Sequence, residues 1–166
     1  MKRIGLLSDT HHFIHPATFR FFDRCDEIWH AGDIGSIEIA DQLAAFKPLR
    51  AVYGNIDGAD IRLEYPEIQV FTCESVKVLI KHIGGYPGRY APGVKELLVK
   101  EKPKLFVSGH SHILKAMPDK KFGLLHLNPG AAGKQGLHKH ITMMRFSITY
   151  DRIQDLEIKE IKRKSF

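Results

Sequence analysis

Short apolar runs alternate with helical patterns through the first third of the chain. Residues 2–8, 27–31 and 49–53 are apolar runs of the length typical of buried strands. Residues 16–24 and 36–46 lie between these runs and carry apolar side chains at helical spacing. This order predicts parallel strands joined by right-handed crossovers. Ligands of such sheets bind beyond the carboxyl ends of the strands, so we expect a site there.

Beyond residue 60 the pattern is dominated by strands. Only residues 92–102 have a helical pattern. The predicted strands of this part are residues 67–71, 76–81, 105–108, 113–117, 124–128, 141–148 and 153–161. We therefore predict two sheets packed face to face, with helices outside them. The 166 residues show no repeat or linker, which favours a single domain over residues 1–166.

Composition narrows the class of protein only slightly. The chain has no apolar stretch near the roughly 20 residues of a membrane span, no signal-peptide pattern after Met1, and two cysteines. A cytoplasmic protein without membrane contact is the expectation. The formal net charge of +6 can attract nucleic acid. Much of this charge lies in Lys159, Lys162, Arg163 and Lys164, and the absence of interleaved aromatic residues favours a solvated tail.

Five apolar runs end in residue types that bind metal ions. These residues are Asp9 and His11, Gly32-Asp33, Gly54-Asn55, His82, and Gly109-His110-Ser111-His112. In an extended segment, residues two apart share a face, so each histidine-containing pair can converge on one point. Carboxylate, imidazole and amide ligands suit divalent ions such as Mn²⁺, Fe²⁺, Zn²⁺ or Ni²⁺, and the absence of cysteine argues against a structural zinc.

About seven ligands are too many for one ion. They suit two ions roughly 3.5–4 Å apart that share a bridging carboxylate. Such a pair lowers the pKa of a bridging water and clamps phosphate oxygens during an in-line displacement. The sequence therefore predicts chemistry on an anionic phosphate ester.

In these five ordered motifs the chain resembles the calcineurin-like metallophosphoesterase superfamily. The family pattern of D-x-H, GD, GN, H and GH-x-H is present from residue 4 to about residue 130. The small size and the turn at residues 128–130 resemble the compact bacterial and archaeal phosphodiesterase branch. The resemblance implies an α/β fold, namely a four-layer α/β/β/α sandwich of two mixed β-sheets flanked by helices.

The resemblance also implies a role for each ligand residue. Asp9, His11 and His112 would hold the first ion, Asn55, His82 and His110 the second, and Asp33 would bridge the two. The implied function is a dinuclear-metal phosphodiesterase that uses a metal-bridging hydroxide, with Asp33, Asn55 and His110 as its catalytic residues. The implied cofactors are two divalent ions, with Mn²⁺ favoured over Ni²⁺, Fe²⁺, Zn²⁺ or Co²⁺, and the substrate would be a small phosphate ester or a nucleotide.

Two positions depart from the family pattern. Ile56 stands where many members have a histidine that can protonate the leaving group. Because loss of general-acid help costs about 10²–10⁴-fold, we expect slow turnover or a preference for good leaving groups. Ile83 stands after His82, where the family usually has glycine.

Residues near the motifs offer further expectations. His12 follows a ligand residue, and Arg89 ends a glycine-rich segment after His82, so both are candidate substrate contacts, with exposed loop positions as the alternative. Asp57 is expected to cap a turn or to orient a histidine, and Asn128 to shape a turn near the ions. The other histidines are assigned structural or interface roles: His30, His126, His138 and His140.

Three other functions remain open at the level of sequence. The first is a non-catalytic interaction module, like the scaffolding subunit of the eukaryotic retromer complex that shares this compact fold. The second is a metal-dependent nuclease, which needs a basic groove leading to the ions. The third is a phosphomonoesterase, which needs a closed, arginine-lined pocket. A homo-oligomer is a possible assembly that no residue selects.

Overall fold

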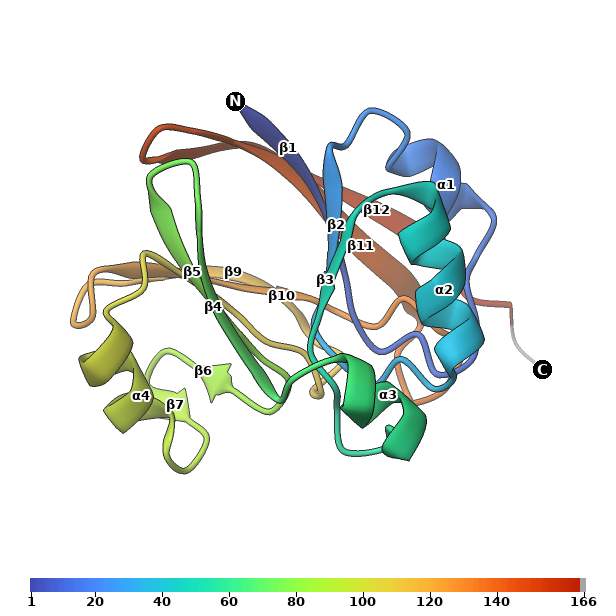
Figure 1. Ribbon diagram of the computed structural model, residues 1–166, viewed down its shortest axis with the longest axis horizontal. Helices are drawn as coiled ribbons and strands as arrows, with labels where there is room; N and C mark the ends of the chain where they lie inside the picture. The colour runs from blue at the N-terminus through green and yellow to red at the C-terminus, as the bar shows by residue number, and fades with distance from the viewer. Residues whose placement is uncertain (165–166) are drawn as a thin grey trace.

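Two five-stranded sheets form the centre of the computed structural model, which describes residues 1–164 (Figure 1). Residues 165 and 166 of the predicted domain lie outside the described residues. The first sheet has the order β12-β11-β1-β2-β3, formed by Arg152–Lys162, His140–Thr149, Lys2–Leu7, Glu27–His30 and Leu49–Ala51. The second has the order β4-β5-β8-β10-β9, formed by Ile68–Cys73, Val76–Lys81, Leu105–Val107, Leu124–Pro129 and Leu114–Asp119.

Both sheets are mixed. Strands β1, β2 and β3 are parallel, as the strand–helix alternation predicts, while β11 joins β1 antiparallel. In the second sheet β8 runs parallel to both β5 and β10, and the two edge strands are antiparallel to their neighbours. The carboxyl ends of β1, β2 and β3 therefore lie at one edge of the first sheet, and those of β5 and β8 at one edge of the second.

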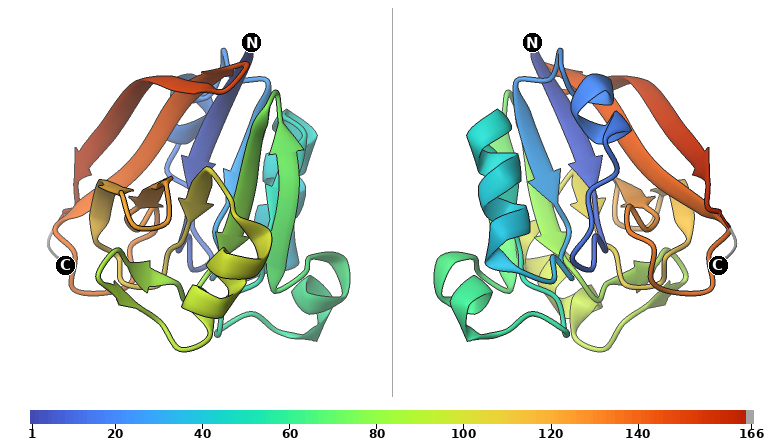
Figure 2. Two further views of the ribbon diagram at one scale, coloured as in Figure 1. Left: turned by 90° about the vertical axis from the view of Figure 1, so that its left-hand side faces the viewer. Right: turned by 90° about the vertical axis from the view of Figure 1, so that its right-hand side faces the viewer.

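Helices cover the outer faces of the sheets (Figure 2). Helices α1 (Ala17–Phe21) and α2 (Ile37–Phe46) pack on the first sheet, where Leu43 and Phe22 join a buried cluster with Ile28. Helix α4 (Val94–Glu101) packs on the second sheet through Leu98. This arrangement confirms the predicted four-layer α/β/β/α sandwich.

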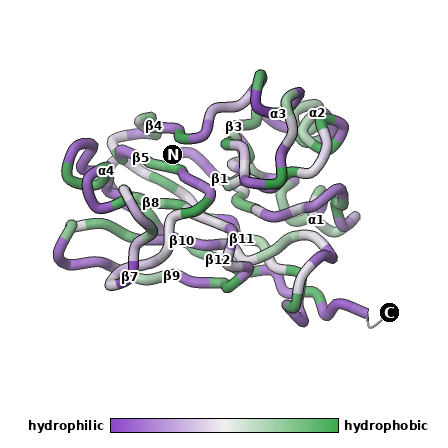
Figure 3. Tube along the Cα trace, turned by 90° about the horizontal axis from the view of Figure 1, so that it is seen from below, coloured by the Kyte–Doolittle hydropathy of each residue, from purple (hydrophilic) through white to green (hydrophobic). Residues whose placement is uncertain are grey.

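The core between the two sheets is apolar. Trp29 of β2 is fully buried there and meets Phe71 of β4 and Phe146 of β11 edge-on, with ring centroids 5.1 and 5.7 Å apart. Apolar side chains of β5 and β8 complete this cluster from the second sheet, and Figure 3 shows hydrophobic positions along both strands. Burial of this surface is the main force that holds the sheets together.

The prediction that only residues 92–102 form a helix after residue 60 is wrong. A short helix, α3 (Ala59–Glu64), follows the third parallel strand. It buries one side chain, Ile61, so its sequence shows no helical pattern of apolar residues. The glycine-rich segment after His82 is also more regular than expected, because Gly85–Tyr86 and Arg89–Tyr90 pair as the strands β6 and β7.

The predicted bounds of most elements differ from the observed ones by one or two residues, and helix α1 and strand β3 show the physical reasons best. Helix α1 ends at Phe21, short of the predicted residue 24, because Phe22 leaves the helical conformation and inserts under β1 against Gly5. Strand β3 ends at Ala51, two residues before the predicted end. Among the described residues, no helix is long and apolar enough to cross a membrane.

Candidate metal centre

The carboxyl ends of four strands bring two groups of ligand-type residues together. Asp9, His11 and His112 form one group, and Asp33, His82 and His110 form the other, with one ligand atom of each residue within 4.8 Å of the others in its group. The first group is the set expected for the first ion. The second joins the expected bridging aspartate to two of the residues expected at the second ion. Residues from both sheets contribute to each group.

The carboxylate of Asp33 lies between the two groups. Its Oδ2 atom is 3.1 Å from Nε2 of His82 and 3.5 Å from Nε2 of His11, which belong to different groups. In the first group, Oδ1 of Asp9 is 3.2 Å from Nε2 of His112. The same atom of Asp9 is 3.8 Å from Nε2 of His82, so both carboxylates face histidines of both groups.

Asn55, the remaining expected ligand, lies at the same edge. It follows β3 and is exposed, and it lines a pocket of about 230 Å³ together with His82. Its backbone carbonyl accepts a long hydrogen bond of 3.5 Å from Arg62 of α3. The structure thus places Asn55 beside the second group of ligand residues.

An unusual backbone conformation presents these side chains. Asp9, His11, Asp33, His110 and His112 all have positive φ, between 44° and 69°. Residues with a Cβ adopt this region at a cost of roughly 1–2 kcal/mol each, and such residues cluster at functional sites. The chain therefore turns sharply after each strand and directs the side chain back toward the sheet edge.

The glycines of two motifs leave room for the ligand residues. A Cβ atom at Gly54 would collide with the carboxylate of Asp33, and one at Gly109 would collide with Ser8 and come within 2.7 Å of Oδ2 of Asp9. Glycine at these positions therefore follows from close approach of the backbone to the two aspartates.

Each aspartate has one oxygen held by the protein and one directed into the cluster. Oδ2 of Asp9 accepts hydrogen bonds from the Ser8 hydroxyl at 2.6 Å and from the His110 backbone N–H at 3.1 Å. Oδ1 of Asp33 accepts from the Ile56 backbone N–H at 3.1 Å. These bonds fix both carboxylates while the other oxygen of each faces the histidines.

His82 is oriented in the same way. Its Nδ1–H donates to the backbone carbonyl of Ala31 at 2.7 Å, which leaves Nε2 facing the aspartates. Nε2 of His82, Nε2 of His11 and Oδ1 of Asp9 are buried and have no hydrogen-bond partner among the described residues. Three convergent buried atoms without hydrogen-bond partners, all of types that bind divalent ions, fit a metal site.

Electrostatics agree with this fit. Burial acts to raise the pKa of the Asp9 carboxyl, but its interactions with His11, His112 and His82 outweigh burial and hold the pKa far below the ordinary value. Asp33 follows the same pattern: His82 outweighs burial and lowers its pKa. Asp9 raises the pKa of His11, whereas for His82 burial is opposed and outweighed by the two aspartates, so its pKa is also raised. The cluster thus keeps two anions and attracts positive charge.

Asp57 joins the loops that carry the ligands. Its carboxylate accepts backbone N–H bonds from Ile34 at 3.1 Å, Gly35 at 2.9 Å and Gly54 at 2.8 Å. It therefore ties the loop after β2 to the loop after β3. Of the two roles expected from the sequence, a turn cap or a contact that orients a histidine, its hydrogen bonds to backbone N–H groups correspond to the first. Asn128 supports the loop after β8 in a similar way, since its Nδ2 donates to Gly109 O at 3.0 Å.

His30 and Thr10 form a buried support under the cluster. Nδ1 of His30 accepts from the Gly32 N–H at 3.0 Å, and its Nε2 lies 3.0 Å from Oγ1 of Thr10, whose hydroxyl donates to Ile34 O. Burial lowers the pKa of His30 to about 4, which fits a neutral ring. Thr10 carries no motif signal beyond its place between Asp9 and His11.

The other expected residues lie outside the two ligand groups. His12 is exposed next to His11, and Arg89 is exposed on β7, with no side-chain hydrogen bond to a ligand residue in the described part of the chain. His138 meets the ring of His112 edge-on at 5.2 Å and bonds to Gly133 O at 2.7 Å. His126 is buried on β10, where its Nδ1–H donates to Phe106 O at 3.1 Å.

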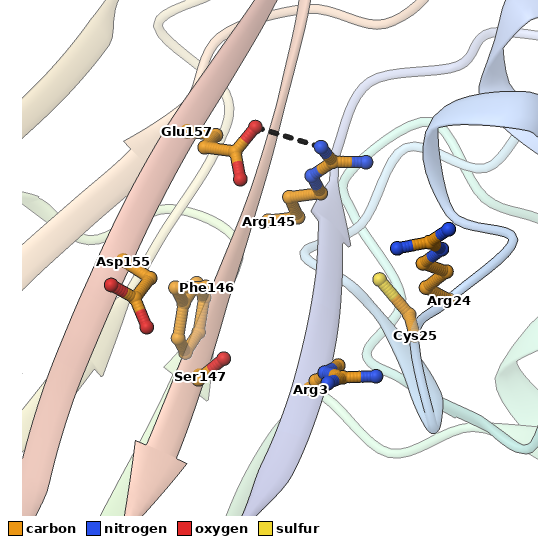
Figure 4. A pocket seen from close by; sticks show the side chains of 8 residues that line it. All are labelled: Arg3, Arg24, Cys25, Arg145, Phe146, Ser147, Asp155 and Glu157. Carbon is orange, nitrogen blue, oxygen red and sulfur yellow. Dashed lines mark hydrogen bonds and ion pairs between the residues drawn. The ribbon is translucent and has the colours of Figure 1, made fainter.

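A larger pocket lies apart from the motifs (Figure 4). It has a volume of about 320 Å³ and is lined by Arg3, Arg24, Cys25, Arg145, Phe146, Ser147, Asp155 and Glu157. Arg145 pairs with Glu157 at 2.7 Å, and Arg3 lies near the start of β1, whereas the ligand residues follow its end. No candidate ligand residue lines this pocket.

Comparison with known proteins supports the assignment that the motifs and the geometry suggest. The calcineurin-like phosphoesterase superfamily domain matches residues 1–151. This chain belongs to that superfamily. A probable metallophosphoesterase of Methanothermobacter thermautotrophicus is 31% identical over 135 residues, which cover 77% of this chain and 76% of the relative. The family is metal-dependent and acts on phosphate esters.

Solved structures share the fold. A Vps29 variant from Entamoeba histolytica has a TM-score of 0.76 at 16% identity and covers 96% of this chain and 98% of its own. A structure described as a novel archaeal phosphodiesterase has a TM-score of 0.74 at 19% identity and covers 96% and 99% of the two chains. At these identities the likeness establishes the architecture, and the activity has to be argued from the site.

Proposed function

We propose that this protein is a phosphodiesterase that depends on two divalent metal ions, with Mn²⁺ favoured. The observation that carries the proposal is the pair of ligand groups with the Asp33 carboxylate between them. Asp9, His11 and His112 would hold one ion, and Asn55, His82 and His110 the other. The buried ligand atoms without hydrogen-bond partners support this set.

The residues of the chain hold and orient the reacting groups. Two bound ions would supply a water acidic enough to ionise near neutral pH and would offset the charge of the phosphate. The contacts of Ser8, Ala31 and Ile56 keep the carboxylates and His82 in place before substrate arrives. Such preorganisation favours an in-line attack on phosphorus because little reorganisation remains.

The surroundings of the cluster favour a diester. A diester needs room for a substituent besides the leaving group, and the pocket of about 230 Å³ beside Asn55 and His82 adjoins the ligand loops. This pocket is not closed and lacks the several arginines that would favour a monoester.

A second candidate is a non-catalytic interaction module on the same fold. The observation in its favour is that Ile56, Ile83 and Ile113, each next to a proposed ligand, are 43%, 38% and 59% exposed. Exposed apolar side chains can mark an interaction surface. The same side chains could contact an apolar ester group, so an activity measurement decides between the two functions.

The test compares bis-p-nitrophenyl phosphate with p-nitrophenyl phosphate. Chelator-stripped protein reloaded with Mn²⁺ should hydrolyse the diester faster, and removal of the metal should abolish the reaction. Asp33→Asn and His110→Ala should lose more than about 100-fold of the activity, since even outer residues of metal sites contribute 10–100-fold. The matched control is Asp23→Asn, at an exposed carboxylate outside the cluster.

Folding of each variant is checked by circular dichroism. Full activity in either ligand variant would contradict the proposal. Absence of hydrolysis by protein with two bound ions would favour the interaction module.

A further inference from the structure

The pocket beside Asn55 and His82 is lined by two cationic side chains, Arg62 and Lys81, that belong to none of the five motifs. Its lining is Tyr53, Gly54, Asn55, Arg62, Glu67, Lys81, His82 and Ile83, around a volume of about 230 Å³. Two of these residues are proposed ligands of the second ion, so the pocket opens directly beside the candidate metal centre. We call it the Arg62–Lys81 pocket.

Arg62 is held in place by neutral groups. Its Nε–H donates to Asp57 O at 2.6 Å, one terminal NH₂ group donates to Asn55 O at 3.5 Å, and the guanidinium lies 4.4 Å from the centroid of the Tyr53 ring. Among the residues that the structure describes, no carboxylate lies within ion-pair distance of Arg62. The guanidinium is therefore oriented while its charge is not neutralised by a protein anion.

Lys81 brings a second charge to the pocket. It ends β5 one residue before His82, and its Nζ lies 3.4 Å from Oε1 of Glu67. The Lys81 side chain is 17% exposed, whereas that of Glu67 is 57% exposed. An ion pair with one solvated partner is weak, so an incoming anion can replace Glu67. The pocket has two cationic side chains against one carboxylate.

We infer that the Arg62–Lys81 pocket binds a second phosphate group of the substrate, carried on one of the two ester substituents of the scissile phosphodiester. The inference rests on the proposed function, because it assumes that the scissile diester is held at the neighbouring metal centre. The planar donors of arginine match phosphate oxygens, and lysine adds a point charge. The substrate class is then a phosphodiester that bears a further phosphate, such as a nucleotide unit phosphorylated at its other end.

Two substrates with the same leaving group test this inference. Thymidine 5′-(p-nitrophenyl phosphate) and its 3′-phosphorylated derivative differ only in the second phosphate, and release of p-nitrophenolate reports cleavage of the diester alone. With Mn²⁺-loaded protein, the 3′-phosphate should raise kcat/KM by roughly tenfold or more, the effect of a charge-assisted hydrogen bond. The readout is the ratio of the two kcat/KM values, which any general loss of activity leaves unchanged.

Variants of the pocket should remove this preference. We expect the ratio to fall to near one in Lys81→Met and in Arg62→Gln. The matched control is Lys77→Met, which removes another lysine of β5 whose partner is Glu101 and which does not line the pocket. This control should keep the preference of the unmodified protein.

The outcomes separate the two proposals. If the protein cleaves both diesters with equal efficiency, or if both pocket variants keep the wild-type ratio, the inference is wrong and the phosphodiesterase proposal stands. If the metal-loaded protein cleaves neither diester, the proposed function itself fails.

Discussion

Single atoms define the candidate metal centre. Asp9 and Asp33 each have one oxygen held by the protein and one oxygen facing the histidines, and His82 has one nitrogen held by Ala31. Ile56 contributes only its backbone N–H, which donates to Asp33. Its aliphatic side chain is 43% exposed and has no proton to donate to a leaving group.

Replacing Ile56 by histidine should supply the missing proton. The Ile56→His variant is expected to raise kcat/KM for diphenyl phosphate by up to about 10²-fold, because a general acid helps most where the leaving group is poor. The gain on bis-p-nitrophenyl phosphate should be much smaller. Leu63→His, on an exposed position of α3, is the control. The same gain for both substrates, or none for either, would contradict the role assigned to position 56.

At the level of elements, strand β10 of the second sheet supports the loop that follows β8 and carries His110 and His112. Asn128 of β10 holds the loop after β8, and His126 of the same strand packs against Phe106 of β8, with ring centroids 5.3 Å apart. His126 is fully buried, and burial lowers its pKa to about 4. The strand thus carries a histidine whose protonation the folded state opposes.

This histidine should make the protein sensitive to acid. As the pH falls below the ordinary value near 6.5, the unfolded chain binds a proton at His126 while the folded chain does not until about pH 4, so stability is lost across this window. Between pH 7 and pH 5 the loss should be about 2 kcal/mol greater than in His126→Asn, whose side chain does not titrate. Urea unfolding at both pH values, in chelator, measures the difference.

His140→Asn, at an exposed position at the start of β11, is the matched control. It should show the pH dependence of the unmodified protein. An unchanged pH dependence in His126→Asn would mean that the buried ring takes up a proton without penalty.

At the scale of the whole molecule, the candidate metal centre lies where the two sheets meet. Asp9, His11 and Asp33 follow strands of the first sheet, and His82, His110 and His112 follow strands of the second. Bound ions would therefore link the sheets in addition to the apolar core between them. Metal binding should consequently stabilise the fold as a whole.

The melting temperature should report this link. At a free Mn²⁺ concentration 100 times the Kd, each bound ion stabilises the fold by about 2.7 kcal/mol, which corresponds to a rise in Tm of about 5–10 °C per ion for a chain of this size. We expect Asp33→Asn to show a much smaller rise and Asp23→Asn to show the full one. Calorimetry with Mn²⁺ and with chelator makes the comparison. An equal rise in all three proteins would place the stabilising ions elsewhere.

The sequence by itself determined the local features of this protein. Apolar runs of strand length and apolar residues at helical spacing are short-range patterns in the sequence. These patterns predicted the three parallel strands, helix α2 and the β-rich second half. A polar ligand type directly after a strand is also a local signal, which is why Asp9, His11, Asp33, His82, His110 and His112 could be named together with the sheet edge where they gather. Helix α3 escaped prediction because it buries only Ile61.

The tertiary structure alone decided which residues meet. Asp9 and His112 are far apart in the chain, and their distance depends on how the two sheets pack and on the register of their strands. The same packing places Asp33 between the two groups and lets Asp57 join two loops. The Arg62–Lys81 pocket has no local signature, because α3 and β5 become neighbours only when both sheets have formed. Such contacts depend on the packing of segments that are distant in the sequence, and short-range patterns do not show which of these segments meet.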